Sequence, residues 1–287
     1  MTQPGSSPGV VVRTLQRFGA DGVATVDDPV AVEAPLEIRV NGRGYAVTMR
    51  TPGHELDLAA GFLVSEGVIG AAGDLTAVAL VADEEQEGWE RHDELAGDVV
   101  EATVAGPGAL VAMDRQRHVY TTSSCGVCGL ASIDAVTTTS RFDVRTDHAS
   151  VPAAVFGTLP DTLRAAQAAF ESTGGLHAAG LFAADGRVVV VREDVGRHNA
   201  VDKVVGHAIR AGVLPLAGHV LQVSGRASFE LVQKAAMAGI PVLAAVSAPS
   251  SLAVDLAESA GITLVGFSRG GSFNVYTHPA RIDGLSS

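Results

Sequence analysis

The chain has 287 residues, 47% of them hydrophobic, and a formal net charge of −12. This length is enough for one large domain or two small ones with a substantial core, and the composition indicates a compact globular protein. The acidic balance argues against a nucleic-acid-binding protein that depends on a basic face. No apolar run reaches the roughly 20 residues that a membrane span requires.

The first 120 residues predict a tail followed by a β-rich region. Residues 1–8 lack the charged and apolar parts of a secretory signal and are expected to be a disordered tail, so we expect a cytoplasmic protein. Residues 9–120 form the first predicted domain, in which short β-rich runs alternate with Gly, Asp and Asn. The predicted strands are 10–12, 36–40, 45–49, 77–81 and 99–104.

One helix is predicted inside this region. Thr51-Pro52 indicates its start, because proline is tolerated in the first helical turn. The apolar residues from Leu56 to Val64 recur at helical spacing, and Gly67 predicts the end.

Residues 121–287 form the second predicted domain, which begins with a loop that contains both cysteines. After it, Asp161 predicts the cap of a helix near 162–172 that Gly174-Gly175 ends. The elements then follow the order α-β-β-α-β-α-β-α-β, which indicates an α/β fold built as a three-layer sandwich. The predicted strands are 176–182, 187–192, 219–223, 241–246 and 262–266, and the predicted helices lie around 201–208, 229–236 and 251–259.

Cys125 and Cys128 are the only cysteines, and they lie three positions apart among glycines and hydroxyl residues. This spacing suits thioredoxin-type redox chemistry, half of a metal site, or a nucleophilic cysteine that carries a persulfide. No second cysteine pair is present to complete a zinc site, and the residues that follow are weak helix formers. A reactive thiolate on a loop is therefore the leading interpretation, and we expect no zinc.

Three segments at helix starts or strand ends carry groups that suit an anionic ligand. They contain backbone amides, hydroxyls and arginines where α/β folds bind ligands. Capping or a simple turn explains each one locally, and His177 suits either a core position or a ligand contact. No Walker A or G-x-G-x-x-G pattern is present. The candidate residues are His177, Asp194, Arg197, His198, Ser224, Gly225, Arg226, Phe267, Ser268, Arg269, Gly270, Gly271 and Ser272.

These segments, taken in order, resemble the FdhD family of formate dehydrogenase accessory sulfurtransferases. The resemblance rests on Ser124–Gly129, Gly175–His177, Glu193–Lys203, Ser224–Arg226 and Gly266–Tyr276, and extends over roughly residues 30–283.

The resemblance implies a sulfur carrier. A cysteine desulfurase would load sulfur onto Cys125, with Cys128 as an assisting thiol, for delivery to molybdenum bis(molybdopterin guanine dinucleotide), the substrate. Formate dehydrogenase would be the client. Phe267–Ser272 would line the guanine-nucleotide end of the cofactor, and the protein would be a homodimer.

The family fold is similar to that of cytidine deaminase. Zinc deaminases place H-x-E and P-C-x-x-C at two helix starts, whereas residues 194–198 and 224–228 contain no cysteine. We therefore expect a cytidine deaminase-like fold without zinc and without deamination.

Two other functions stay open on sequence alone. One is a molybdenum-cofactor chaperone that transfers the cofactor without sulfur chemistry. The other is a Cys-x-x-Cys disulfide reductase. A zinc-binding module ranks last.

Overall fold

The structure is a computed structural model that describes residues 9–20, 22–81, 98–108 and 140–284. The predicted tail (1–8) and the two cysteines lie outside the described residues.

A six-stranded mixed sheet forms the centre of the molecule, in the order β13-β12-β11-β10-β8-β9. β10, β11 and β12 are parallel, and β8, β9 and β13 are each antiparallel to their neighbours. The carboxyl ends of the three parallel strands therefore meet at one edge. The strands are β8 (His177–Ala183), β9 (Val188–Asp194), β10 (His219–Val223), β11 (Val242–Ala245), β12 (Thr263–Arg269) and β13 (Ser272–Thr277).

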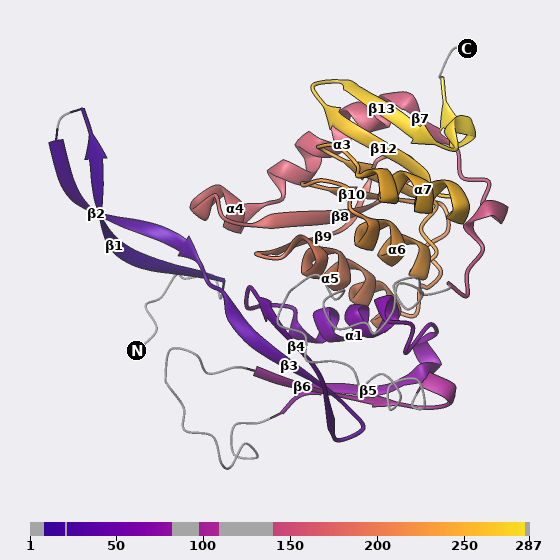
Figure 1. Cartoon of the computed structure of the whole chain (residues 1–287), viewed down its shortest axis with the longest axis horizontal. Helices are drawn as coiled ribbons and strands as arrows, with labels where there is room; N and C mark the ends of the chain where they lie inside the picture. Colours follow the sequence, from indigo (N-terminus) through magenta and orange to yellow (C-terminus); the bar gives the residue numbers. More distant parts are fainter. Residues whose placement is uncertain (1–8, 21, 82–97, 109–139, 285–287) are drawn as a thin grey trace.

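Helices cover both faces of this sheet (Figure 1). On one face Phe156, Leu159 and Leu163 of α3 pack against alternate strand residues such as Val220 and Val242. The intervening strand residues point to the other face and join a larger core with α5, α6 and α7. The predicted three-layer α/β architecture is thus confirmed; its likeness to cytidine deaminase stays a prediction. The helices are α3 (Ala153–Ala165), α4 (Ala168–Thr173), α5 (Arg197–Arg210), α6 (Phe229–Met237) and α7 (Ser251–Ala260).

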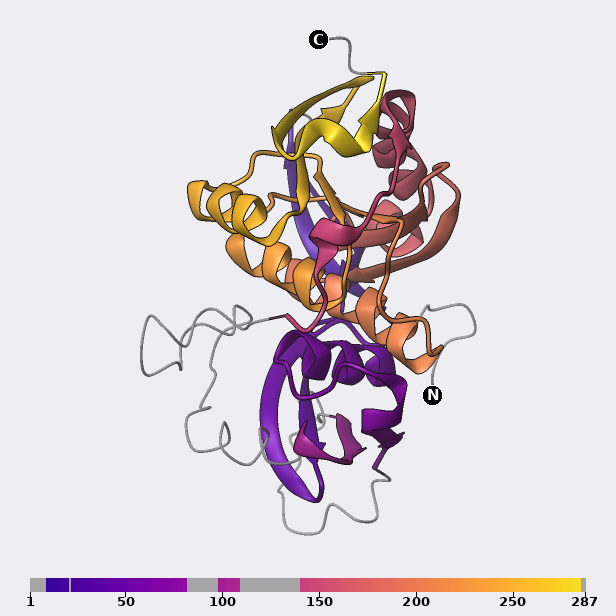
Figure 2. The same ribbon diagram turned by 90° about the vertical axis from the view of Figure 1, so that its right-hand side faces the viewer.

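The N-terminal region forms a second sheet, in the order β4-β3-β6-β5, with α1 packed on it. α1 lies between this sheet and α5, as Figure 2 shows. The elements are β3 (Ala34–Val40), β4 (Arg43–Arg50), α1 (Glu55–Ser65), η1 (Ala72–Asp74), β5 (Leu75–Leu80) and β6 (Asp98–Val104). Short elements complete the described chain: η5 (Val144–Thr146), β7 (Val151–Pro152), η6 (Pro279–Arg281) and β14 (Ile282–Asp283).

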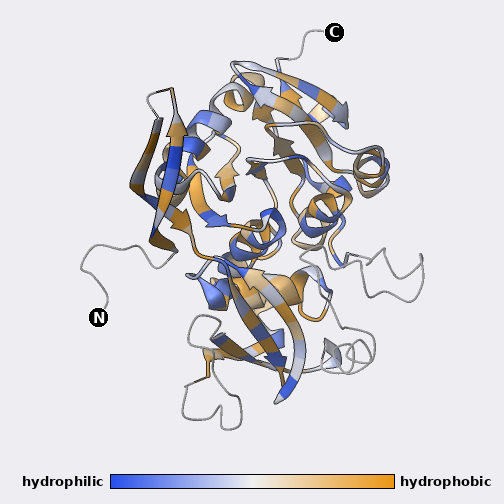
Figure 3. Cartoon of the chain, turned by 60° about the vertical axis from the view of Figure 1, so that its left-hand side comes forward, coloured by the Kyte–Doolittle hydropathy of each residue, from blue (hydrophilic) through white to orange (hydrophobic). Residues whose placement is uncertain are grey.

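A separate hairpin, β1 (Val10–Gly19) and β2 (Gly22–Ala31), projects from the body of the molecule (Figure 1). Apolar and polar segments alternate along it in Figure 3, and Phe18 near its tip is 77% exposed. Its base lies beside the α4 helix, which β2 contacts.

The predicted order of elements from α4 to β12 is confirmed, and the strand 219–223 matches β10 residue for residue. The Asp161 cap is wrong: Asp161 lies inside α3, which begins at Ala153 and contains Pro160. The predicted helix 162–172 is instead the end of α3 and the short α4, which Gly174 ends with a positive φ of 67°. α1 begins at Glu55 rather than at Thr51-Pro52, with His54 in the left-handed region as its N-cap. β2, β7, β13 and β14 were not predicted.

No helix in the described ranges has the length and apolar character needed to cross a membrane.

α1 and α5 approach each other so closely that only glycine, which has no side chain, fits at the points of contact. A Cβ added at Gly61 would lie 1.8 Å from the carbonyl oxygen of Asp202, and one at Gly206 would lie 1.7 Å from that of Asp57. Next to this contact Asp202 accepts hydrogen bonds from Ser65 Oγ at 2.6 Å and from Lys234 Nζ at 2.8 Å. The molecule thus has two halves, the N-terminal region with α1 and the region of the central sheet with α5, and the two glycines set the distance between them. A buried polar cluster joins α1, α5 and α6.

We predict that Gly61→Ala lowers the free energy of unfolding by about 3 kcal/mol or more, because the new methyl group collides with backbone. Helix propensity alone would make the Gly61→Ala variant more stable by about 1 kcal/mol. The sign of the change in the free energy of unfolding therefore separates the two effects. Urea denaturation measures the change. Gly73→Ala is the matched control, since nothing lies within 4 Å of its Cβ position. Equal stability of the two variants would contradict the close-packed contact.

Candidate functional site

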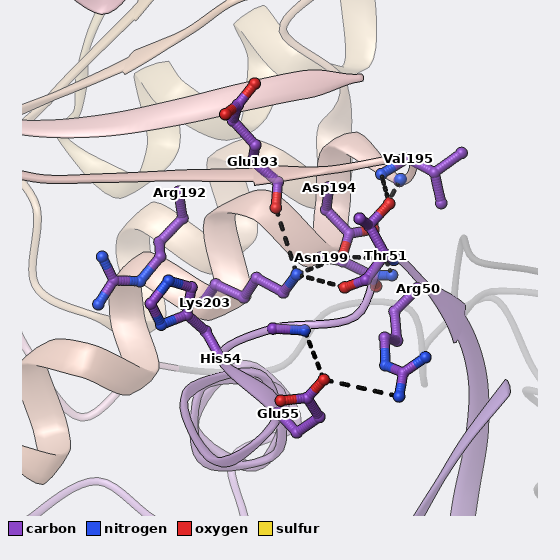
Figure 4. A network of polar contacts seen from close by, with 12 residues as sticks. Arg50, Thr51, His54, Glu55, Arg192, Glu193, Asp194, Val195, Asn199 and Lys203 are labelled. Atoms are coloured by element: carbon purple, nitrogen blue, oxygen red, sulfur yellow. Dashed lines mark hydrogen bonds and ion pairs between the residues drawn. The ribbon is translucent and has the colours of Figure 1, made fainter. Parts of the chain in front are cut away.

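A fully buried ion pair lies at the junction of the two halves (Figure 4). Lys203 Nζ on α5 is 2.7 Å from Asp194 Oδ2 at the end of β9, and the two side chains are 1% and 0% exposed. Lys203 also donates to the backbone oxygens of Thr51 at 2.9 Å and Glu193 at 3.2 Å. Asp194 in turn accepts from the amides of Thr51 and Gly196 at 3.1 and 2.8 Å. Both charged groups thus have hydrogen-bond partners within the protein in addition to each other.

Thr51 connects the N-terminal region to the start of α5. Its hydroxyl accepts the amide of Val195 at 3.1 Å, while its own amide and carbonyl bond Asp194 and Lys203. Asn199 adds a second connection, because its Nδ2 donates to Met49 O at 2.8 Å and to Asp194 Oδ1 at 3.1 Å. The first turn of α5, which carries two predicted site residues, is therefore positioned by the segment before α1.

The starts of α5 and α6 are joined by His198. Its Nε2 lies 3.3 Å from Ser228 Oγ and 3.4 Å from Glu230 Oε2. The hydrogen bond to His198 is the main reason that the pKa of Glu230 is lowered from 4.5 to about 2. This contact fixes the relative position of the two helix N-termini that flank the segment Ser224–Arg226.

His177, Gly225 and Arg197 gather above the same edge of the sheet. A Cβ at Gly225 would lie 3.6 Å from His177 Nδ1 and 3.9 Å from Arg197 Cδ, which places the Gly225 backbone against these two side chains. Burial, followed by the nearby Arg197 charge, lowers the pKa of His177 below its ordinary 6.5. The Nε atom of Arg197 is buried and has no hydrogen-bond partner within the described part of the chain.

A cavity of about 580 Å³ opens where the carboxyl ends of the parallel strands meet α3 and α4. It brings together three predicted site residues, His177, Ser224 and Arg269, from three different strand ends. Its volume lies within the range of small-molecule sites. The lining residues are Pro160, Asp161, Leu163, Arg164, Gln167, Phe170, Gly174, Gly175, Leu176, His177, Ser224, Val246 and Arg269.

The segment Phe267–Ser272 lies at the turn between β12 and β13. Phe267 has a positive φ of 52°, an uncommon conformation for a bulky residue, beside an irregularity in the β12–β13 pairing. Ser268 is buried, and its hydroxyl donates to Phe156 O at 2.8 Å. Arg269 is exposed, and Gly270 and Gly271 form the turn with positive φ.

Of the remaining predicted residues, Ser224 and Ser272 make hydrogen bonds within the fold, whereas Arg226 is exposed to solvent. Ser224 Oγ accepts the amide of Ala178 at 2.9 Å, which ties β10 to β8, and the Ser272 hydroxyl donates to Arg269 O at 3.2 Å. Arg226 is exposed beside the helix start. Cys125 and Cys128 lie outside the described residues. Within the described ranges, no three His, Cys, Asp or Glu side chains come together in a way that could hold a metal ion.

The sequence analysis did not assign Thr51 and Lys203, which position the site residues, to the site, although Lys203 ends the motif Glu193–Lys203 and Thr51 opens the predicted helix. It also did not single out Arg164 and Phe170, which line the cavity. Two features of the sequence point to Lys203: it ends the motif Glu193–Lys203, and it is a charged residue between the apolar positions Val201 and Val204 of the same helix. No such feature points to Arg164, because an exposed arginine near a helix end is ordinary.

Comparison with known proteins places the chain among curated relatives over nearly its whole length. A model described as the FdhD/NarQ family matches residues 31–283. A protein named sulfur carrier protein FdhD from Streptomyces avermitilis is 55% identical over 271 residues, covering 94% of each chain. One of the same name from Sulfolobus acidocaldarius is 44% identical over 261 residues, covering 91% of this chain and 93% of the relative.

A solved structure, described as a formate dehydrogenase accessory protein from Desulfotalea psychrophila, has the same fold. Its TM-score is 0.73 at 25% sequence identity, and the match covers 96% of this chain and 100% of that one.

Breaking the buried ion pair is expected to destabilise the protein strongly. We predict that Asp194→Asn costs about 3–5 kcal/mol, because it leaves the Lys203 ammonium buried without a counter-charge. Combining it with Lys203→Met should cost clearly less than the sum of the two single changes. Chemical denaturation measures all three, with the exposed Asp255→Asn as control. A loss below 1 kcal/mol in Asp194→Asn would show that the pair does not hold the halves together.

The lowered pKa of Glu230 predicts a specific acid dependence. A depressed carboxyl pKa stabilises the folded state above the unfolded value of 4.5, and that contribution is lost as the pH falls towards about 2. The stability difference between the wild type and Glu230→Gln should therefore be constant just above pH 4.5 and shrink between pH 4.5 and 2. Denaturation curves across this range test it; a difference independent of pH would refute the His198 contact as its cause.

Proposed function

The chain belongs to the FdhD/NarQ family, and from that premise we propose that it is a sulfur carrier for formate dehydrogenase maturation. In this proposal the protein accepts persulfide sulfur from a cysteine desulfurase on Cys125. It then transfers this sulfur to molybdenum bis(molybdopterin guanine dinucleotide), which is its substrate, before the cofactor enters formate dehydrogenase. The thiols require a reducing compartment, so the proposal includes a cytoplasmic location.

The observation that carries the proposal is the cavity at the carboxyl edge of the central sheet. His177, Ser224 and Arg269 come from segments far apart in the sequence, yet all three line it. Arg197 has a spare buried donor beside it, and Arg226 is exposed at the adjacent helix start. Such a group of donors suits the phosphates of a nucleotide-bearing cofactor.

His177 contributes a neutral donor or acceptor rather than a charge. Since burial lowers its pKa below 6.5, its imidazole is uncharged at neutral pH. It can therefore bond a polar group of the cofactor without adding to the positive charge that the arginines supply. Gly225 lies next to this imidazole.

The first chemical step is persulfide transfer. The Cys125 thiolate attacks the outer sulfur of the desulfurase persulfide, forming the new S–S bond while the bond to the desulfurase sulfur breaks. The desulfurase cysteine leaves as a thiolate, and Cys125 then carries one sulfane sulfur.

In the second step Cys128 releases that sulfur. Its thiolate attacks the Cys125 Sγ atom, a Cys125–Cys128 disulfide forms, and the outer sulfur leaves as hydrosulfide towards the cofactor. The electron pair that leaves with the sulfur comes from oxidation of the two thiols. A dithiol reductant must reduce the disulfide before the next cycle.

The test of sulfur loading uses the purified full-length chain, a cysteine desulfurase and cysteine, followed by peptide mass spectrometry without reductant. We expect one extra sulfur on the Cys125 peptide of the wild type. Cys125→Ala should show none. Cys128→Ser should still be loaded, because this thiol acts only at release.

The absence of added sulfur, with a desulfurase shown to be active, would contradict the proposal. A cofactor chaperone would bind the cofactor and support the client enzyme without either cysteine. A disulfide reductase would instead show turnover with a generic disulfide.

A further inference from the structure

A second polar cluster lies away from the cavity, where the start of α1 meets the end of α5. Its centre is Asp57, whose side chain is 3% exposed. Arg192 on β9 donates to Asp57 Oδ2 from Nη2 at 2.9 Å and from Nε at 3.3 Å, and Arg210 in the last turn of α5 donates to Oδ1. Two guanidinium groups thus share one carboxylate, which leaves one positive charge unbalanced.

Two imidazoles border the same carboxylate without bonding it. The Nδ1 atoms of His54 and His207 lie 3.8 and 3.9 Å from Asp57 Oδ2, beyond hydrogen-bond distance. His207 Nδ1 is 3.2 Å from Arg192 Nη2, and because a guanidinium only donates, the proton of the neutral imidazole sits on Nε2. Among the described residues, neither imidazole uses its Nε2 atom in a hydrogen bond to a neighbour.

The backbone at His54 has an uncommon conformation. Its φ of 63° and ψ of 36° lie in the left-handed region, which costs energy for a residue that has a side chain. The imidazole makes no capping hydrogen bond to α1 and extends towards Arg192 instead (Figure 4). Residues held in such conformations concentrate at ligand-binding and switch regions.

The cluster is positive and accessible to solvent. The side chains of His54, His207 and Arg210 are 56%, 43% and 38% exposed. Burial lowers the pKa of His54, and the charge of Arg192 adds more to this effect than Asp57 opposes. The local positive charge contrasts with the net charge of −12. A helix favours cations in its last turn, which explains His207 and Arg210 but not His54 and Arg192.

Arg210 still has donors for a ligand, and it lies far from the cavity. Its Nη1 bonds Asp57, whereas its Nε and Nη2 have no partner within the described ranges. Arg192 is more fully occupied, because its Nη1 also donates to Val191 O at 3.1 Å. Arg197 and Arg210 are the first and last residues of α5, which at 1.5 Å per residue puts them about 20 Å apart. The cluster is therefore separate from the sheet edge where Arg197 lies.

We propose that His54, His207 and Arg210 form a binding site for a tetrahedral dianion such as phosphate or sulfate. Arg210 supplies a charge-assisted hydrogen bond, His207 supplies the N–H group at Nε2, and His54 supplies a second imidazole donor. Arg192 is a positioning residue, since it holds Asp57 and fixes the proton of His207 on Nε2. His54 belongs to the N-terminal half and the other two ligands belong to α5, so the bound anion stabilises the docking of the two halves.

Titration of the full-length chain with sodium sulfate and, separately, with sodium phosphate tests this site. The imidazole ¹H and ¹⁵N resonances of His54 and His207 are followed at neutral pH, while sodium chloride keeps the ionic strength constant. We expect the resonances of both residues to shift in a saturable way and to give one shared dissociation constant for each anion. Sodium chloride alone should not produce these shifts.

Two variants and a matched control assign the site to its residues. Arg210→Gln should weaken sulfate binding about tenfold, because it removes the charged donor. His54→Asn keeps a residue that tolerates the left-handed backbone but removes the imidazole, and it should weaken binding about threefold. Arg269→Gln removes the same charge as Arg210→Gln, but from the cavity, and should leave the dissociation constant measured at His207 unchanged.

Equal affinity in the wild type and both variants would overturn the site, and so would shifts that chloride reproduces. Loss of binding in Arg269→Gln would also overturn it, because the anion would then act from the cavity. If Arg210→Gln does not fold, His54→Asn decides, since its side chain is exposed and unchanged affinity in that variant would refute the site. Sulfur loading of Cys125 plays no part in this test, so its result leaves the proposed function standing.

Discussion

The arrangement of the whole molecule depends on one buried ion pair, Asp194–Lys203. Removing two charges from water costs several kcal/mol per ion, so such a pair is tolerated only when every remaining hydrogen-bonding position is filled. Here the partners come from both halves of the chain: Thr51 supplies an amide and a carbonyl, and the start of α5 supplies the amide of Gly196. The charges are therefore compensated only when the N-terminal sheet and the central sheet are docked. The backbone contact of Gly61 and Gly206 fixes the distance at which this happens.

That constraint divides the polar residues of the site into two kinds. Asp194, Ser268 and His198 are buried and occupied by contacts within the fold, so they position strand ends and helix starts. Arg269 and Arg226 are exposed at the carboxyl edge, where the parallel strands end. A rigid buried layer thus presents accessible cations at one edge, which is the property that a carrier of a large anionic cofactor needs. The cavity at this edge supports the proposal that an anionic cofactor binds there.

The central sheet could be predicted from the sequence because most of its strands are largely apolar runs next to glycine or proline, as at 242–245, which follows Pro241. The sequence predicted β13 poorly because Ser272–Thr277 alternates between exposed and half-buried positions and has no apolar run. The break between α3 and α4 depends on Glu193, which lies more than 20 residues away and caps α4 across space. The candidate site residues chosen from the sequence include three that line the cavity, His177, Ser224 and Arg269. Thr51 and Arg164 act through contacts that no local pattern encodes.

In the proposed function, this chain moves sulfur onto a cofactor bound at the edge of the central sheet. The most direct measurement loads Cys125 with ³⁵S from labelled cysteine and a desulfurase, removes the donor, and adds bis(molybdopterin guanine dinucleotide)-bound molybdenum. We expect the label to leave the protein and to appear on the cofactor in a single turnover, and we expect Cys128→Ser to slow this release without preventing loading. Label that stays on Cys125 while the cofactor binds would contradict sulfur transfer and would favour a cofactor chaperone.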